Sequence, residues 1–191
     1  MNIIVWEVGK MKKILVTILI LTIGISSIFA NMSELSFFRK KLLEFGVSPK
    51  RAEEFLSTYT EIASIMDINV NVFEILAIGW QETNWQNVMG DSNLSYGYFQ
   101  IQKEAYWYTK SYYPQVYQYF KFSTSWDKSI NRPDIQLVTM CLYLHMLKEK
   151  EKDSLKAYAR YNGIGIPAYK YSISVWEKIS ILLAEYTGSI I

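Results

Sequence analysis

Residues 71–83 read NVFEILAIGWQET, and residues 84–102 continue NWQNVMGDSNLSYGYFQIQ. Asn71 and Glu74 are three positions apart, which is the spacing of a capping box at the start of a helix. The helix that follows is apolar on nearly every side, as is typical of a helix at the centre of a domain. Further on, the helical period is lost and glycines and other turn formers accumulate. We therefore expect a central helix that ends near Glu82, followed by a loop that is irregular or a short hairpin.

The sequence on either side of this stretch is helical almost throughout. Ser48-Pro49, for example, is a cap followed by a proline in the first helical turn. Repeats and low-complexity linkers are absent, so residues 31–191 are expected to form one mainly α domain. We expect the other helices at 33–46, 48–66, 133–152, 154–162 and 175–186.

The N-terminus has the layout of a secretory signal peptide. Two lysines precede an uncharged apolar stretch, residues 14–25, and a small-residue stretch follows that ends at Ala30. We expect residues 1–30 to be this signal peptide and the protein to be exported, either periplasmic or secreted. Two alternatives remain: Met11 is the true start, and residues 14–30 are retained as a membrane anchor.

The charge balance excludes one class of partner. Removing residues 1–30 takes Lys10, Lys12, Lys13 and Glu7 from the 20 basic and 18 acidic residues, which leaves 17 of each. A neutral chain lacks the clustered Lys and Arg that bind a nucleic-acid backbone. Nucleic acid is therefore not an expected partner.

The single cysteine and the single histidine lie in the same apolar segment. Cys141 is interpreted as a buried small hydrophobic residue and His145 as a structural residue. Histidines and cysteines with metal-ligand spacing are absent from the sequence, as is a glycine-rich phosphate loop. No metal and no cofactor is expected.

Glu82 is the candidate catalytic residue. It ends the central apolar helix between Trp80 and Trp85, and burial against apolar walls raises the pKa of a carboxyl group. A carboxylic acid that is still protonated near neutral pH can donate its proton to a glycosidic oxygen. The alternative is that Glu82 is an ordinary exposed residue in the last helical turn.

Three motifs with this glutamate resemble the catalytic domain of the soluble lytic transglycosylases, a branch of the lysozyme-like superfamily related to goose-type lysozyme. The motifs are Glu82-Thr83, then Gly97-Tyr98-Phe99-Gln100-Ile101 fifteen residues after the glutamate, and Ala159-Arg160-Tyr161-Asn162-Gly163. The resemblance covers about residues 70–170. It departs from the family at Thr83, where serine is usual, and at Tyr98 and Phe99, which replace leucine and methionine.

The resemblance implies a lysozyme-like fold and a lyase that acts on peptidoglycan. Glu82 would be the general acid and base that cleaves the bond between N-acetylmuramic acid and N-acetylglucosamine, leaving a 1,6-anhydro ring. Gln100, Tyr161 and Asn162 would line the site, and Gly97 would let the backbone approach the sugar. The residues that flank Gly97, namely Ser95, Tyr96 and Tyr98, are assigned to the same substrate-binding cleft.

Two rival functions remain open. Asp91 stands nine residues after Glu82, and a second carboxylate that positions water would make the protein a muramidase; Asp91 is otherwise a turn residue. A non-catalytic component that binds peptidoglycan within an envelope-spanning assembly is the third hypothesis. The expected partners are glycan strands and an envelope or secretion-machinery protein, and the chain is expected to be a monomer.

Overall fold

The computed structural model describes residues 32–122 and 125–188, and the signal-peptide prediction therefore lies outside the described residues. The chain forms two compact units, Met1–Ser36 and Phe37–Ile191. Residues 32–36, the described part of the first unit, are helical, and the second unit begins with the helical residues 37–44. The second unit then contains α2 (Pro49–Ile65), α3 (Val72–Thr83), β1 (Met89–Gly90), β2 (Ser95–Tyr96), β3 (Ile101–Gln102), α4 (Lys103–Tyr112), α5 (Pro114–Tyr119), α6 (Trp126–Ile130), α7 (Pro133–Glu151), α8 (Ser154–Asn162) and α9 (Gly165–Gly188).

Two of the predicted helix starts, at Ser48 and Asn71, are confirmed by their capping bonds. The side chain of Ser48 accepts a hydrogen bond from the backbone of Arg51 at the start of α2. Asn71 caps α3, and the side chain of Glu74 accepts a hydrogen bond from the backbone N–H of Asn71, which completes the capping box. These bonds satisfy N–H groups that a helix start leaves without partners. The protein is mainly α, as the sequence predicted.

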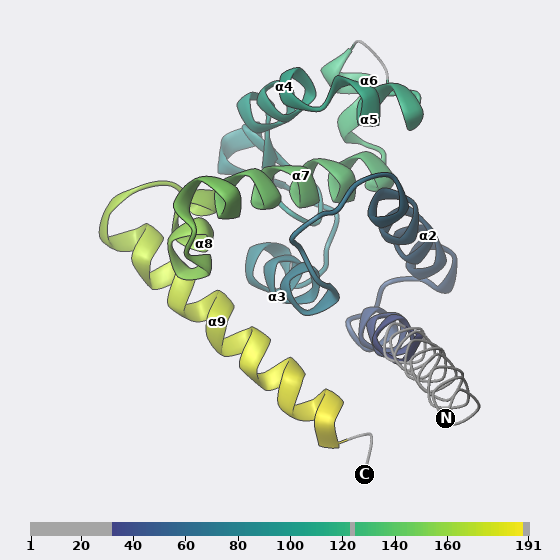
Figure 1. The fold of residues 1–191 in the computed structure, drawn as a ribbon, viewed down its shortest axis with the longest axis vertical. Helices are drawn as coiled ribbons and strands as arrows, with labels where there is room; N and C mark the ends of the chain where they lie inside the picture. The colour runs from purple at the N-terminus through teal and green to yellow at the C-terminus, as the bar shows by residue number, and fades with distance from the viewer. Residues whose placement is uncertain (1–31, 123–124, 189–191) are drawn as a thin grey trace, which may run out of the picture. The chain divides into compact units, whose positions relative to one another are not determined.

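Helix α3 is the centre of the second unit. Its residues from Val72 to Gly79 are all buried. It packs along α9, while α7 runs across the unit between α2 and α8, as Figure 1 shows. In the same figure, α9 and α2 lie on opposite sides of α3. The apolar character of α3 thus places its C-terminal end, with Glu82, inside the unit.

A buried charge network joins α3 to two other helices. Lys148 on α7 donates to Oε1 of Glu74 at 2.8 Å, and the Tyr158 hydroxyl on α8 donates to the same oxygen at 2.5 Å. The second carboxylate oxygen of Glu74 is used by the capping box. A buried carboxylate is tolerated when both oxygens are hydrogen-bonded, as they are here.

The loop after α3 is a small antiparallel sheet. Met89 pairs with Tyr96, and Tyr96 also pairs with Ile101, so β2 lies between β1 and β3. The β1–β2 connection, residues 91–93, runs through left-handed conformations. The expected hairpin is therefore present, with a third strand added.

Two segments differ from the sequence expectation. Helix α9 begins at Gly165, ten residues before the expected start at Val175. The tyrosine-dense region between β3 and α7 forms three short helices, α4, α5 and α6. Within the described ranges, no helix is both long enough and apolar enough to span a bilayer.

Candidate active site

The C-terminal end of α3 opens onto a cavity of about 190 Å³. Five of the residues predicted for the site line it, and they come from four segments of the chain: Glu82, Asp91, Gln100, Tyr161 and Asn162. The other lining residues are Ile101, Gln102, Glu104, Ala105, Tyr143, Arg160 and Gly163. The fold therefore brings the three sequence motifs to one cavity.

Glu82 is held by a tyrosine from the last helix. The Tyr171 hydroxyl donates a hydrogen bond of 2.6 Å to Oε1 of Glu82. Burial raises the pKa of Glu82 to about 7; the Tyr171 hydrogen bond opposes this rise, and the negative charge of Asp91 adds to it. Glu82 is thus a partly buried carboxyl group that carries its proton up to near neutral pH, as expected for a general acid.

Three tyrosines from α7, α8 and α9 form a row beside the acid. The rings of Tyr161 and Tyr171 are stacked, with centroids 6.5 Å apart and planes inclined by 10°. Tyr143 lies 5.7 Å from Tyr161 and also lines the cavity. The pKa values of Tyr161 and Tyr171 are raised, first by burial and then by the charge of Glu82, so Tyr171 remains a hydrogen-bond donor.

The walls around Glu82 differ from those expected in the sequence. Trp85 packs into the core, where Gly79 leaves room for its ring and its indole N–H donates to the carbonyl of Leu76. Trp80 lies beneath the ammonium group of Lys178. The aromatic residue that hydrogen-bonds the acid is a tyrosine, Tyr171.

Ser95 and Gln100 fix the hairpin against the cavity. The buried Ser95 hydroxyl lies 2.6 Å from Oε1 of Gln100 and 3.2 Å from Oδ2 of Asp91, and can donate to either. The Gln100 amide donates to the carbonyls of Val88 and Gly97. Ser95 therefore acts beneath the cavity, where it links two residues that line it.

The structure corrects the reason given for Gly97. A Cβ at Gly97 would lie 2.0 Å from Oε1 of Gln136 on α7, and its φ is +77°. Gln136 in turn accepts the backbone N–H of Tyr98 and donates to the carbonyl of Ile130. Glycine is required here because the hairpin turn meets α7, where a Cβ would clash with the Gln136 side chain.

The side chains of Tyr96 and Tyr98 lie in different surroundings. Tyr98 packs edge-on against Phe55 with centroids 5.1 Å apart, so its ring belongs to the aromatic core and not to the cleft that we expected. Tyr96 packs edge-on against Trp126 and lines a neighbouring cavity. The backbone of Tyr98 is fixed by Thr83, whose hydroxyl donates to its carbonyl at 2.9 Å.

Two neighbouring cavities share lining residues with the Glu82 cavity. The one beside Tyr96, of about 350 Å³, shares Gln102 and Glu104 with it. Another of about 350 Å³ shares Tyr143, Arg160 and Gly163 with it. Shared lining residues place both cavities beside the Glu82 cavity.

The lone histidine and cysteine do not line these cavities. His145 Nδ1 accepts the backbone N–H of Asn69 at 3.1 Å, and burial lowers the pKa of His145. Cys141 is fully buried, and burial raises the pKa of its thiol. Both are packing residues, as interpreted from the sequence. In the part of the chain that the structure describes, no group of three or more His, Cys, Asp or Glu side chains is placed to hold a metal ion.

Sequence reasoning missed Tyr143 and Tyr171. Tyr171 was outside the expected last helix, although small and apolar residues recur at helical spacing from Ala168 through Val175. That periodicity was the available signal for the longer helix. Comparison with family models, with curated proteins and with solved structures finds no match to this chain.

Proposed function

We propose that this chain is a lytic transglycosylase with a lysozyme-like fold that cleaves the glycan strands of peptidoglycan. The observation that carries the proposal is the Glu82 carboxyl group, whose pKa is raised to about 7 and which lines a cavity of about 190 Å³. Tyr161 and Gln100 from the matching motifs line the same cavity. The substrate and the product follow from the motif resemblance.

In this proposal Glu82 acts first as an acid and then as a base. The protonated carboxyl group donates its proton to the oxygen that links N-acetylmuramic acid to N-acetylglucosamine, and the C1–O bond breaks. The carboxylate then takes the proton of the muramic acid C6 hydroxyl, whose oxygen bonds to C1. A 1,6-anhydro ring forms without water, and Glu82 regains its proton.

The Tyr171 hydrogen bond suits both states of Glu82. A donor at 2.6 Å stabilises the carboxylate after proton transfer, while burial favours the neutral acid before it. The hydroxyl also fixes the orientation of the carboxyl group. Since Tyr171 comes from α9 and Glu82 from α3, the packing of these two helices sets the position of the acid.

A muramidase is the second candidate, and the position of Asp91 favours it. Asp91 lines the same cavity as Glu82, and its charge acts on the Glu82 pKa. Its φ of +47° and its place at the β1–β2 connection also make it a turn residue. A carboxylate at this position could direct a water molecule to C1, and the product would then be a reducing sugar.

Mass spectrometry of the muropeptides released from purified peptidoglycan tests the proposal. The protein is compared with Glu82→Gln and with the control Glu61→Gln, which changes an exposed carboxylate on α2. We expect products one water lighter than ordinary muropeptides, released by the protein and the control and lost in Glu82→Gln.

The other outcomes separate the rivals. Products of ordinary reducing-end mass would contradict the transglycosylase and support the muramidase, and Asp91→Asn would then abolish release. Failure of the folded protein to release any product, together with binding to peptidoglycan that Glu82→Gln retains, would support a non-catalytic envelope component.

A further inference from the structure

Helix α9 carries an exposed apolar stripe that no described residue covers. Its members recur every three or four positions, so they share one helix face. They keep large exposed fractions: Ile166 73%, Tyr169 62%, Ile173 39%, Trp176 50% and Leu183 41%. Ser180 occupies the remaining position of this pattern.

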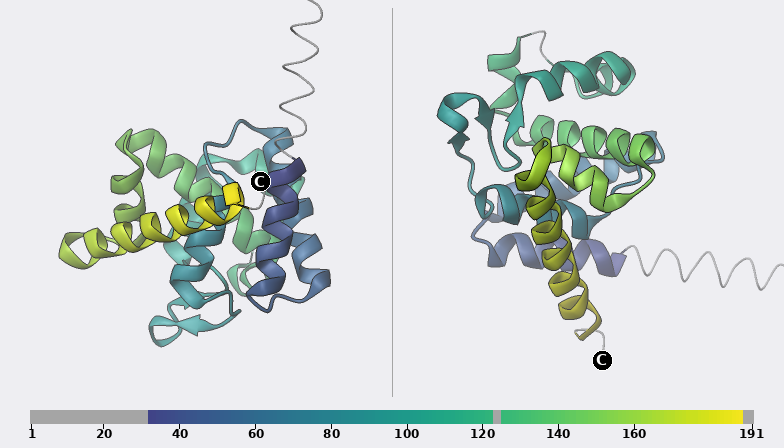
Figure 2. Two further views of the ribbon diagram at one scale, coloured as in Figure 1. Left: turned by 90° about the horizontal axis from the view of Figure 1, so that it is seen from below. Right: turned by 90° about the vertical axis from the view of Figure 1, so that its left-hand side faces the viewer.

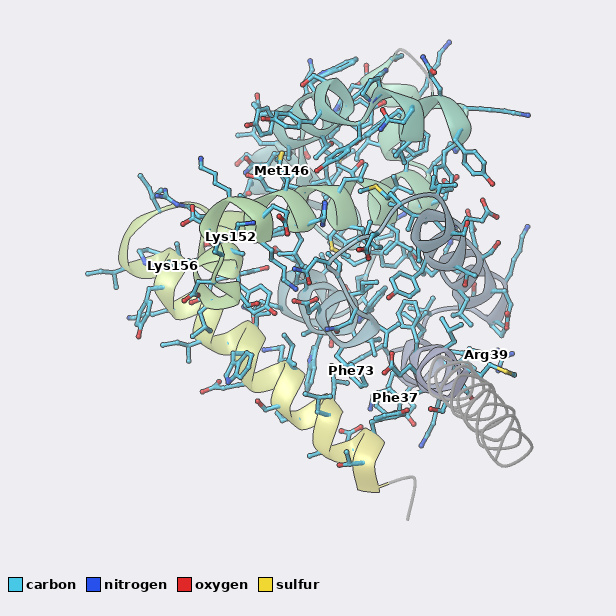
Figure 3. The ribbon with its side chains drawn as sticks, in the orientation of Figure 1. Phe37, Arg39, Phe73, Met146, Lys152 and Lys156 are labelled. Carbon is cyan, nitrogen blue, oxygen red and sulfur yellow. The ribbon has the colours of Figure 1, made fainter. Side chains whose placement is uncertain are left out.

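The opposite side of α9 is already used. Ala168, Tyr171, Val175, Ile179 and Leu182 are buried, and α9 packs on α3 and α8. Figure 1 shows α9 at the margin of the unit, Figure 3 shows side chains projecting away from it, and the right view of Figure 2 shows that margin facing the reader. A helix that is apolar on both sides is expected to be buried on both sides. The stripe therefore indicates a partner.

The spacing of the stripe is that of a two-helix seam. Positions 166, 169, 173, 176, 180 and 183 alternate steps of three and four, which is the a/d pattern of paired helices. An antiparallel pair about a two-fold axis near residues 174 and 175 sets Ile173 opposite Trp176 of the partner subunit. The same register sets Ile166 opposite Leu183 of the partner subunit and uses the whole stripe.

The charges beside the stripe match this antiparallel register. Lys170 and Glu177 are both exposed and flank the stripe on the same side. The register brings Lys170 within two positions of Glu177 of the partner subunit, and the two-fold axis repeats the pair. In a parallel arrangement Glu177 would instead face Ser172, which carries no charge.

We propose that the stripe on α9 is a homodimer interface in which two copies of this chain pair antiparallel. This differs from the monomer expected from the sequence, and it does not depend on the catalytic proposal. A membrane surface fits the stripe less well, because the charge of Lys170 beside it is balanced by Glu177, whereas a helix that binds anionic lipid carries an excess of Lys and Arg there.

Sedimentation equilibrium of the full chain tests the pairing. We expect twice the monomer mass of 22.3 kDa at high protein concentration. Trp176→Glu should raise the dimer dissociation constant about thirtyfold, as loss of a central aromatic contact does. Ile181→Glu is the matched control, because Ile181 is 46% exposed on the same helix but lies outside the stripe. Ile181→Glu should leave the dissociation constant unchanged.

Charge reversal gives a second test on exposed positions that do not endanger folding. Lys170→Glu or Glu177→Lys by itself should weaken the dimer about threefold. The double variant with both reversals should restore it, because the pair is re-formed across the two-fold axis. Circular dichroism checks that each variant remains folded.

Three results would overturn the proposal. The first is that the chain stays monomeric at high concentration, whether its stripe is left exposed or covered by residues 1–31. The second is a dimer that Trp176→Glu and the reversals leave intact, which would place the interface elsewhere. The third is a monomer that binds vesicles of phosphatidylglycerol and phosphatidylethanolamine and loses that binding in Trp176→Glu, which would assign the stripe to a membrane surface.

Discussion

The Tyr171 hydroxyl donates a 2.6 Å hydrogen bond to Oε1 of Glu82, although 89 residues separate the two in sequence. Helix α9 supplies the tyrosine and α3 the glutamate. The stacked ring of Tyr161 adds a third helix, α8, to the same arrangement. The protonation state of Glu82 therefore depends on how α3, α8 and α9 pack together.

The first prediction concerns the pH dependence of glycan cleavage. Cleavage needs protonated Glu82, whose pKa is about 7, so kcat/KM is expected to be high below pH 7 and to fall as the pH rises through that value. The rate of muropeptide release across this pH range measures the descending limb. A limb centred near the ordinary glutamate pKa would contradict the assignment of Glu82 as the acid.

Tyr171→Phe should move this limb upward in pH. The Tyr171 hydrogen bond lowers the pKa of Glu82, so its removal leaves burial less opposed and the pKa rises. Tyr161→Phe is the comparison variant, because the Tyr161 hydroxyl donates to the carbonyl of Phe99 and not to Glu82. The limb should stay in place in Tyr161→Phe. Equal movement in both variants would show a general loss of packing.

Glu82→Gln should stabilise the fold at alkaline pH. Because the pKa of Glu82 is raised on folding from 4.5 to about 7, the folded state binds the proton more tightly than the unfolded state. This contribution to stability is fully present below pH 4.5 and is lost as the pH rises to about 7. Glutamine carries no such charge, so the variant should gain about 3 kcal/mol over the wild type above neutral pH.

Urea unfolding of the two proteins at acidic and alkaline pH measures the difference. The gain should be much smaller at pH 4 than at pH 8. A gain of the same size at both pH values would mean that charge burial is not its cause.

Gly97→Ala should destabilise the protein by about 2–4 kcal/mol, through a left-handed backbone and a clash with the Gln136 side chain. Gly46→Ala is the matched control, because Gly46 also has a positive φ, +84°, but no atom lies within 4 Å of its added Cβ. It should cost only about 1 kcal/mol. Thermal or urea unfolding of both variants gives the comparison, and equal losses would refute the close contact with α7.

Glu74→Ala should cost about 3–5 kcal/mol, because it leaves Lys148 buried without its partner. The control Glu149→Ala removes an exposed carboxylate that pairs with Lys152, and the free energy of unfolding should be essentially unchanged. A small effect of Glu74→Ala would show that water reaches Lys148 and replaces the lost carboxylate.

Local chemistry explains what could be predicted before the structure. Ser48 and Asn71 predict the starts of their helices, because capping involves residues only two or three positions away. The position of Glu82 at the end of an apolar helix likewise follows from periodicity, and with it the direction of its pKa shift. The hairpin was indicated by the turn residues between β1 and β3.

Long-range contacts explain what could not be predicted from the sequence. The expected cause of the raised pKa was a pair of tryptophans near in sequence, but Trp85 turns into the core, where Gly79 makes room for it. The role of Gly97 was misjudged in the same way, because its neighbour Gln136 lies on α7.

The sequence by itself determined the helical class, the helix starts at Ser48 and Asn71, and the position of Glu82 at the end of an apolar helix just before a polar hairpin. These features depend on caps, turns and periodicity, which act over only a few residues. Only the tertiary structure decided that Tyr171 reaches Glu82 and that one face of α9 is left uncovered. Both depend on which helices pack together, and that is set by complementary surfaces far apart in the chain.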